Sequence, residues 1–143
     1  MIRIVIDTNI YISAMINRNS RLRLDLILKD NRFEILTDKA LVNELFEVIN
    51  RPKFRKYVSA EQIDAFMDLL TERSIVISTF SKVSHSPDPK DDFLLALSMD
   101  GSAQYLITGN KIDLLDLKQF ATTSILSLTE FLRIYFPLDQ SNL

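Results

Sequence analysis

The sequence predicts an α/β fold with a mostly parallel sheet, because short aliphatic runs alternate with longer amphipathic segments along the chain. Strands and helices that alternate in this way form parallel sheets joined by right-handed crossovers. The length of 143 residues also fits one domain, since domains most often hold about 100–150 residues. We therefore expect a single domain over residues 1–137 and a frayed tail over residues 138–143.

Five short runs are the expected strands, because aliphatic and β-branched residues favour buried strands. They cover residues 2–6, 33–36, 75–77, 104–107 and 123–126. Helices are expected between them. Ser59 and Gln62 have the spacing of a capping box, so one helix should begin there. The others cover about 10–16, 22–30, 38–50, 91–99 and 129–136, whereas 17–20 and 81–90 are polar and expected to be loops.

The composition excludes several classes of site. The chain has no cysteine, one histidine and two glycines. A disulfide framework, a thiolate nucleophile, a multi-histidine metal site and a glycine-rich phosphate loop are therefore excluded. No apolar run reaches the roughly 18 residues of a membrane span, and the N-terminus has no signal-peptide pattern. We expect a cytoplasmic protein without a membrane partner.

Acidic residues follow several of the expected strands. Asp7 comes directly after the first strand and Asp113 one turn after the fourth, while Glu44 and Asp92 lie on the helices between strands. The carboxyl ends of parallel strands share one edge of the sheet, which is where ligands bind in such folds. Each acid also has a simpler structural role as a helix cap or a surface group. Spacing alone does not decide among Asp88, Asp91 and Asp92, and the simpler interpretation of Asp113 and Asp116 is that both are surface acids near a short helix.

Carboxylates that converge on one pocket repel one another unless a cation compensates their charge. Oxygen ligands without His or Cys favour hard ions such as Mg²⁺ or Mn²⁺. A site of this kind suits phosphodiester hydrolysis, because the metal activates water and stabilises the transition state.

Four segments in order resemble the PIN-domain family, of the type that includes the ribonuclease toxins of prokaryotic toxin–antitoxin pairs. The segments are IRIVIDTN, LVNELFEVI followed by NRPKF, DPKDDFLLAL and YLITGNKIDLL, and with their spacing they span Met1 to about Phe136. The resemblance implies a three-layer α/β/α sandwich with a mostly parallel sheet of four to five strands. It also implies a homodimer, an RNA substrate, a cognate antitoxin protein and Mg²⁺ or Mn²⁺ as cofactor.

The resemblance also assigns site residues. The catalytic and metal-binding acids are Asp7, Glu44, Asp92 and Asp113, with Asp92 preferred over Asp91 because the family has a small residue, here Ala96, four positions later. The groups that orient the acids or the substrate are Thr8, Asn9, Thr108 and Asn110.

The net charge of −2 alone counts against a nucleic-acid partner. If four of the 19 acidic residues bind metal, however, 15 remain against 17 basic residues, which is compatible with RNA. Arg51, Lys53, Arg55 and Lys56, with two interleaved aromatic residues, form the expected RNA-binding cluster. Its simpler interpretation is a solvated loop anchored by Phe54.

The sequence therefore predicts an Mg²⁺- or Mn²⁺-dependent endoribonuclease that acts as the toxin of a toxin–antitoxin pair. One alternative is a PIN-like nuclease that acts in RNA maturation or on structured DNA. A second alternative is an inactive PIN-fold binding module.

Overall fold

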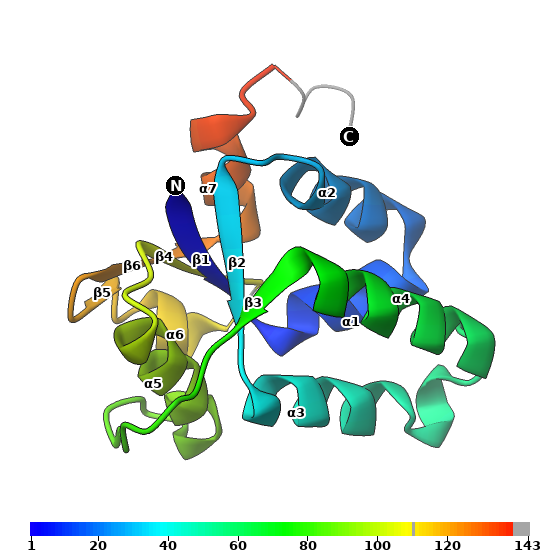
Figure 1. Cartoon of the computed structure of the whole chain (residues 1–143), viewed down its shortest axis with the longest axis horizontal. Coiled ribbons are helices and arrows are strands. Elements are labelled where there is room, and N and C mark those ends of the chain that lie inside the picture. The colour runs from blue at the N-terminus through cyan, green and yellow to red at the C-terminus, as the bar shows by residue number, and fades with distance from the viewer. Residues whose placement is uncertain (110, 139–143) are drawn as a thin grey trace.

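The computed structural model describes residues 1–109 and 111–138 and confirms the α/β class (Figure 1). Within these residues the strands are β1 (Ile2–Ile6), β2 (Phe33–Thr37), β3 (Ser74–Val76), β4 (Tyr105–Thr108), β5 (Gln119–Phe120) and β6 (Thr123–Ser127). The α-helices are α1 (Thr8–Ile16), α2 (Arg18–Leu28), α3 (Lys39–Ile49), α4 (Ala60–Arg73), α5 (Asp92–Asp100), α6 (Ile112–Leu115) and α7 (Leu128–Tyr135). Two short 3₁₀ turns, η1 (Pro52–Phe54) and η2 (Pro89–Asp91), precede α4 and α5.

The strands form one sheet in the order β3-β2-β1-β4-β6-β5. Every neighbouring pair is parallel except β5 and β6. The chain first moves outward from β1 to β2 and β3, and then returns to place β4 on the other side of β1. The strand order therefore reverses between β1 and β4. A crevice for ligands forms at such a point, beyond the carboxyl ends of the strands.

Helices cover both faces of the sheet. Phe33 and Leu36 of β2 point to opposite faces because side chains alternate along a strand. Phe131 of α7 packs on the Phe33 ring, with 5.2 Å between the ring centroids. At the end of α5, a Cβ on Gly101 would lie only 2.6 Å from Leu36 Cδ1, so α5 packs on the other face too closely for a larger residue. The fold is thus a layered α/β/α arrangement of the PIN-like kind.

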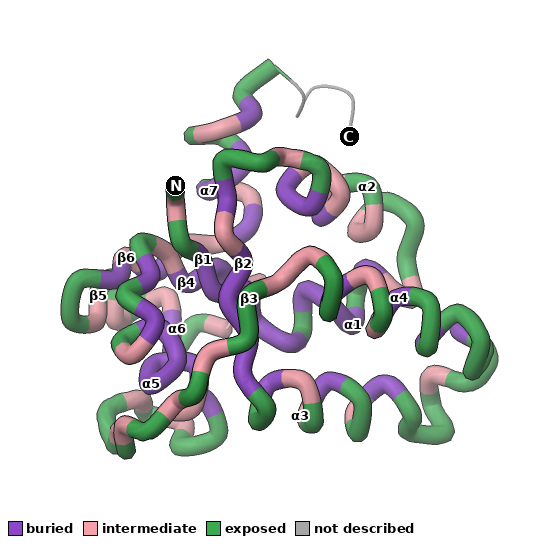
Figure 2. The backbone as a smooth tube through the Cα atoms, viewed as in Figure 1, coloured by how far each residue is buried: buried purple, intermediate pink, exposed green. Residues whose placement is uncertain are grey.

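The hydrophobic core lies along the central strands, where Figure 2 shows most of β2 and the second half of β1 buried. Ile4, Val5 and Ile6 have no exposed surface. Burial stabilises each such side chain by about 1.5–3 kcal/mol. Both faces of β1 are therefore packed near its carboxyl end, and β1 ends at Ile6, directly before Asp7. None of the helices in the described parts of the chain is long and apolar enough to cross a bilayer.

Local signals predicted most elements, and the differences have local causes. The capping box of Ser59 and Gln62 is confirmed at the start of α4. The expectation of a loop over 17–20 was wrong, because the Asn17 side chain accepts a hydrogen bond from the Ser20 amide and α2 starts at Arg18. The sheet has six strands within the described residues, rather than four to five, because the two-residue β5 has no periodicity to detect. Of the expected tail, 139–143 lie outside the described residues.

Candidate functional site

Asp7 is the centre of the candidate site. It follows β1 at the point where the strand order reverses, and it is completely buried. Its Oδ1 accepts a hydrogen bond from the Asn9 amide at 3.3 Å, which caps α1. Its Oδ2 accepts a hydrogen bond from the hydroxyl of Thr108, at the end of β4, at 2.8 Å. The carboxylate is therefore fixed between the ends of two central strands.

Asp91 and Lys111 complete a charged cluster with Asp7. The Lys111 ammonium donates to Asp91 Oδ1 at 2.6 Å and lies 3.7 Å from Asp7 Oδ2. The side chains of Asp7 and Asp91 are 0% and 3% exposed, whereas that of Lys111 is 30% exposed. Two buried carboxylates, from different parts of the chain, thus converge on one positive charge.

Glu44 lies at the edge of this cluster. It is half-buried on α3, and its Oε2 accepts a hydrogen bond from the Thr8 hydroxyl at 2.8 Å. Thr8 is the first residue of α1, directly after Asp7. The Glu44 carboxylate also raises the pKa of Lys111, so it acts on the same ammonium.

Burial opposes the charges in this cluster. Burial raises the pKa of Asp7, and Lys111, Thr108 and the Asn9 amide offset only part of that effect. Burial alone would lower the pKa of Lys111, but attraction to Asp7, Asp91 and Glu44 raises it. Three carboxylates therefore surround one ammonium, and their repulsion favours additional positive charge at the site.

The donor set fits a hard divalent cation. Carboxylate oxygens are the ligands that Mg²⁺ and Mn²⁺ prefer. Across 1–109 and 111–138, no three acidic or histidine side chains are arranged to share one ion. Mg²⁺ does not require three, since one or two carboxylates usually hold it, together with water and substrate phosphates. Asp7 and Asp91 are the residues that would hold the ion, with Glu44 beside them.

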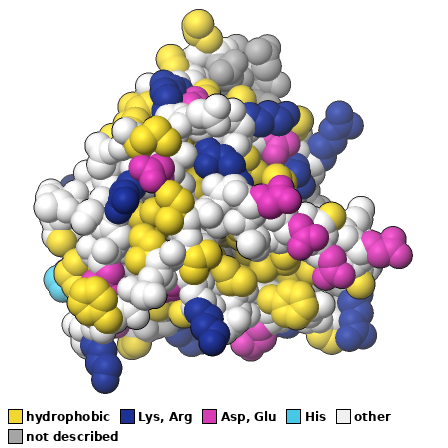
Figure 3. All heavy atoms as spheres, in the orientation of Figure 1, with side chains coloured by type: hydrophobic (Ala, Val, Ile, Leu, Met, Phe, Trp, Pro, Cys, Tyr) yellow, Lys and Arg dark blue, Asp and Glu magenta, His cyan; other side chains and the backbone are white. Residues whose placement is uncertain are grey.

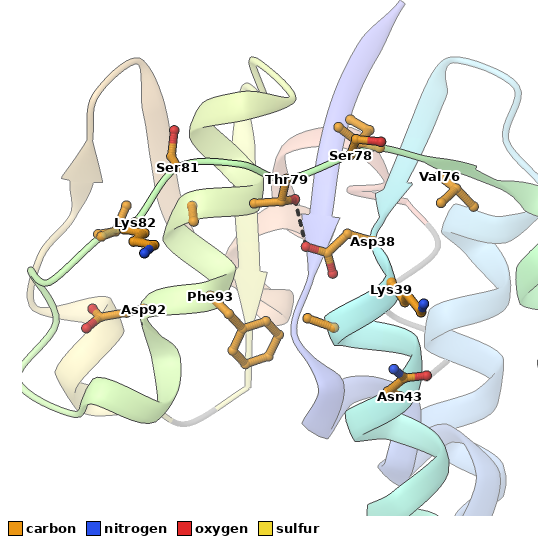
Figure 4. A pocket seen from close by; sticks show the side chains of 14 residues that line it. Asp38, Lys39, Asn43, Val76, Ser78, Thr79, Ser81, Lys82, Asp92 and Phe93 are labelled. Atoms are coloured by element: carbon orange, nitrogen blue, oxygen red, sulfur yellow. Dashed lines mark hydrogen bonds between the residues drawn. The ribbon is translucent and has the colours of Figure 1, made fainter.

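Asp92, which the family pattern favours over Asp91, makes its hydrogen bonds outside this cluster. Asp92 Oδ1 accepts hydrogen bonds from the backbone amides of His85 and Ser86, at 3.2 Å and 2.8 Å. Figure 4 shows Asp92 at one end of a different cavity, of about 910 Å³, which Ala96 also lines. Consecutive helical residues point about 100° apart, and Asp91 is the one of the two that shares Lys111 with Asp7. The η2 turn directs Asp91 toward the cluster.

The fourth expected acid is also not part of the cluster. Asp113 is exposed on α6, and the described residues give it no hydrogen bond or ion pair to Asp7, Asp91 or Glu44. Lys111 takes the position beside Asp7 instead. Among the expected orienting groups, Thr8 and Thr108 contact the acids through their side-chain hydroxyls. Asn9 contacts Asp7 through its backbone amide. Asn110 lies outside the described residues.

The expected RNA-binding cluster is an exposed surface around η1. Arg51, Lys53, Arg55 and Lys56 are all exposed. Lys53 lies over the Phe54 ring and Lys56 over the Tyr57 ring, at 5.0 Å and 5.2 Å from the ring centroids. Phe54 packs against the core, as the simpler interpretation predicted, but the cations above it remain accessible.

Sequence reasoning missed two basic residues near the acids. Lys111 follows the TGN motif, and its position after a central strand was the available signal. Arg23 lines a groove that Asn9 and Lys111 also line. Its partner, Thr129, is 106 residues away along the chain, so no local pattern could reveal the contact.

The domain is a layered α/β/α fold whose doubly wound sheet carries carboxylates at its switch point. Residues 3–112 match the family model of the PIN domain, and the chain therefore belongs to the PIN-domain family. PIN domains are generally nucleases, which supports a hydrolase-type activity. The uncharacterized protein MJ1680 of Methanocaldococcus jannaschii is 31% identical over 120 residues, which cover 82% of this chain and 76% of that protein. No solved structure matches the chain significantly.

Proposed function

We propose that the protein is an Mg²⁺- or Mn²⁺-dependent endoribonuclease. The observation that carries this proposal is the convergence of Asp7 and Asp91, two buried carboxylates, on one positive charge at the switch point of the sheet. Structural stability alone does not explain the pair, because burying carboxylates carries a desolvation cost of several kcal/mol per ion. Charges kept at such a cost are typical of functional sites.

Each residue of the cluster has a distinct part in this proposal. Asp7 and Asp91 hold the metal, and Glu44 adds a third negative charge beside it. Thr108 and the Asn9 amide fix the orientation of the Asp7 carboxylate. A bound divalent ion supplies an activated water and stabilises charge on the scissile phosphate. No histidine base is required, in accord with a chain whose one histidine, His85, packs at a tilted angle against the Phe120 ring.

The charge distribution supports an RNA path over η1 rather than over α4. Figure 3 shows acidic side chains gathered over α4, whose sequence contains Glu61, Asp64, Asp68 and Glu72. Their negative charge repels phosphates from this part of the surface. The basic surface of Arg51, Lys53, Arg55 and Lys56 attracts phosphates, and the exposed Tyr57 ring can stack on an unpaired base.

The test is cleavage of labelled single-stranded RNA by the purified protein in Mn²⁺ or in EDTA. We expect cleavage in Mn²⁺, none in EDTA, and none by an Asp7→Asn variant that retains the wild-type circular dichroism spectrum. Wild-type cleavage by this variant would contradict the proposal. A panel of single-stranded RNA, tRNA and flap DNA distinguishes the RNA-maturation and DNA alternatives. A protein without metal-dependent cleavage or a metal-dependent thermal shift would instead be an inactive binding module.

We also propose that the protein acts as the homodimeric toxin of a toxin–antitoxin pair, held inactive by a cognate antitoxin. The resemblance of the four sequence segments to such toxins supports this role. Induced expression in a bacterial host should arrest growth for the wild-type protein and not for Asp7→Asn. Co-expression of the product of an adjacent small reading frame should relieve the arrest. Arrest by both proteins alike would contradict the role.

A further inference from the structure

A groove of about 670 Å³ opens beside the candidate site. Asn9, Gly109 and Lys111 line it on the side of the acids, and Arg23 and Thr129 line it farther away. Gly109 follows β4, and Thr129 lies in the first turn of α7, directly after β6. The groove therefore runs along the carboxyl edge of the sheet, where folds of this class bind ligands.

Arg23 is a positive charge held in place without a negative partner. Its Nη2 donates a hydrogen bond to the Thr129 hydroxyl at 2.7 Å, which connects α2 to α7. No ion pair joins Arg23 to a carboxylate in the part of the chain that the structure describes. Arg21, on the same helix, pairs instead with Asp25 at 3.0 Å. Since a guanidinium has five N–H donors, Arg23 retains donors for an anion in the groove.

The remaining lining suits the other parts of a nucleotide. Hydroxyl groups of Ser13, Ser20 and Ser127 can bond to a sugar or to the edge of a base. Ile12, Ile16 and the Phe54 ring give the groove apolar surface for the flat face of a base. Lys111 is already paired with Asp7 and Asp91, so Arg23 is the lining cation that makes no ion pair within the described residues. One such cation beside hydroxyl and apolar surface matches one phosphate with its nucleoside, rather than a highly charged polyphosphate.

We propose that this groove binds the nucleotide next to the scissile phosphate of an RNA strand, with Arg23 contacting the phosphate of that nucleotide. The inference rests on the proposed nuclease function and adds a binding site to it. Arg23 acts in binding rather than in the chemical step. The groove extends from Lys111 and Asn9 beside the acids to Arg23, so a strand whose backbone enters at the acids would continue along it.

The experiment measures the salt dependence of RNA binding in EDTA, where cleavage is prevented. The probe is a short fluorescein-labelled oligouridylate, and its anisotropy is followed over a series of KCl concentrations. Each phosphate contact on a single strand contributes about 0.7 to the slope of log K against log salt. We expect Arg23→Gln to reduce this slope by about 0.7. Arg133→Gln, the same charge change at an exposed position on α7, should leave the slope unchanged.

Two further arms make the outcome decisive. Arg23→Lys keeps the positive charge but replaces the guanidinium that connects α2 to α7, and it should retain the wild-type slope. This variant therefore distinguishes loss of the phosphate contact from disturbance of the α2–α7 connection. Equal slopes for Arg23→Gln and Arg133→Gln would overturn the inference while the nuclease proposal stands. If the wild-type protein binds the RNA at no salt concentration, the proposed function fails, and the inference fails with it.

Discussion

Removal of the Lys111 ammonium is the perturbation whose effect the structure defines best. In Lys111→Met the side chain keeps nearly its length, but Asp7 and Asp91 lose the charge that they share at 3.7 Å and 2.6 Å. Loss of one partner from a buried ion pair costs about 3–5 kcal/mol. The Lys111 side chain is 30% exposed, so solvent screening reduces the expected loss to about 2–3 kcal/mol. For a chain of this length, that corresponds to a fall in Tm of about 6–12 °C.

The assay is thermal unfolding followed by circular dichroism, first in EDTA and then over a series of Mn²⁺ concentrations. In EDTA, Lys111→Met should melt well below the wild-type protein. Mn²⁺ should raise its Tm more than that of the wild type, because no ammonium competes for the carboxylates and ligand binding stabilises the folded state. Lys29→Met, at an exposed lysine at the end of α2, is the control and should melt like the wild type. A Tm for Lys111→Met equal to that of the control would refute the assignment of Lys111 as counter-charge.

Three further predictions test the remaining parts of the site. Thr108→Val removes the hydroxyl that orients Asp7 and should lower the RNA cleavage rate about tenfold, which corresponds to about 1.4 kcal/mol; a rate within twofold of the wild type would count against this role. Asp113→Asn should cleave within about twofold of the wild-type rate, because Asp113 is exposed on α6, and loss of cleavage would restore it as a ligand. Burial raises the pKa of Asp7, so folding takes up a proton at Asp7, and this residue should contribute a gain in the stability of the metal-free protein as the pH falls from 7 toward 4. Urea denaturation over this pH range should show less of this gain in Asp7→Asn than in the wild type, and an equal gain would contradict the assignment.

Much of the architecture follows from local sequence, because strands and caps depend on near neighbours. The Ile2–Ile6 strand and the Ser59 capping box are examples. The contact between Asp7 and Thr108 is also predictable from the sequence, since each residue directly follows an expected strand of the parallel sheet. Local pattern and parallel topology together are enough to predict that these two residues meet at the carboxyl edge of the sheet.

The identity of the other site residues depends on geometry that no short pattern encodes. A single 3₁₀ turn decides whether Asp91 or Asp92 faces Asp7, and a count of residues to Ala96 does not detect that turn. The position of Arg23 depends on Thr129, at the opposite end of the chain. The role of Lys111 as counter-charge became evident only from the distances to two buried carboxylates.

We propose that Asp7 and Asp91 together hold a divalent cation. The most direct test of this proposal is isothermal titration of Mn²⁺ into the wild-type protein and two single variants at adjacent positions. Wild type and Asp92→Asn should bind Mn²⁺ with similar affinity, whereas Asp91→Asn should bind at least tenfold more weakly. Unchanged Mn²⁺ affinity in Asp91→Asn, with loss of affinity in Asp92→Asn, would contradict the account.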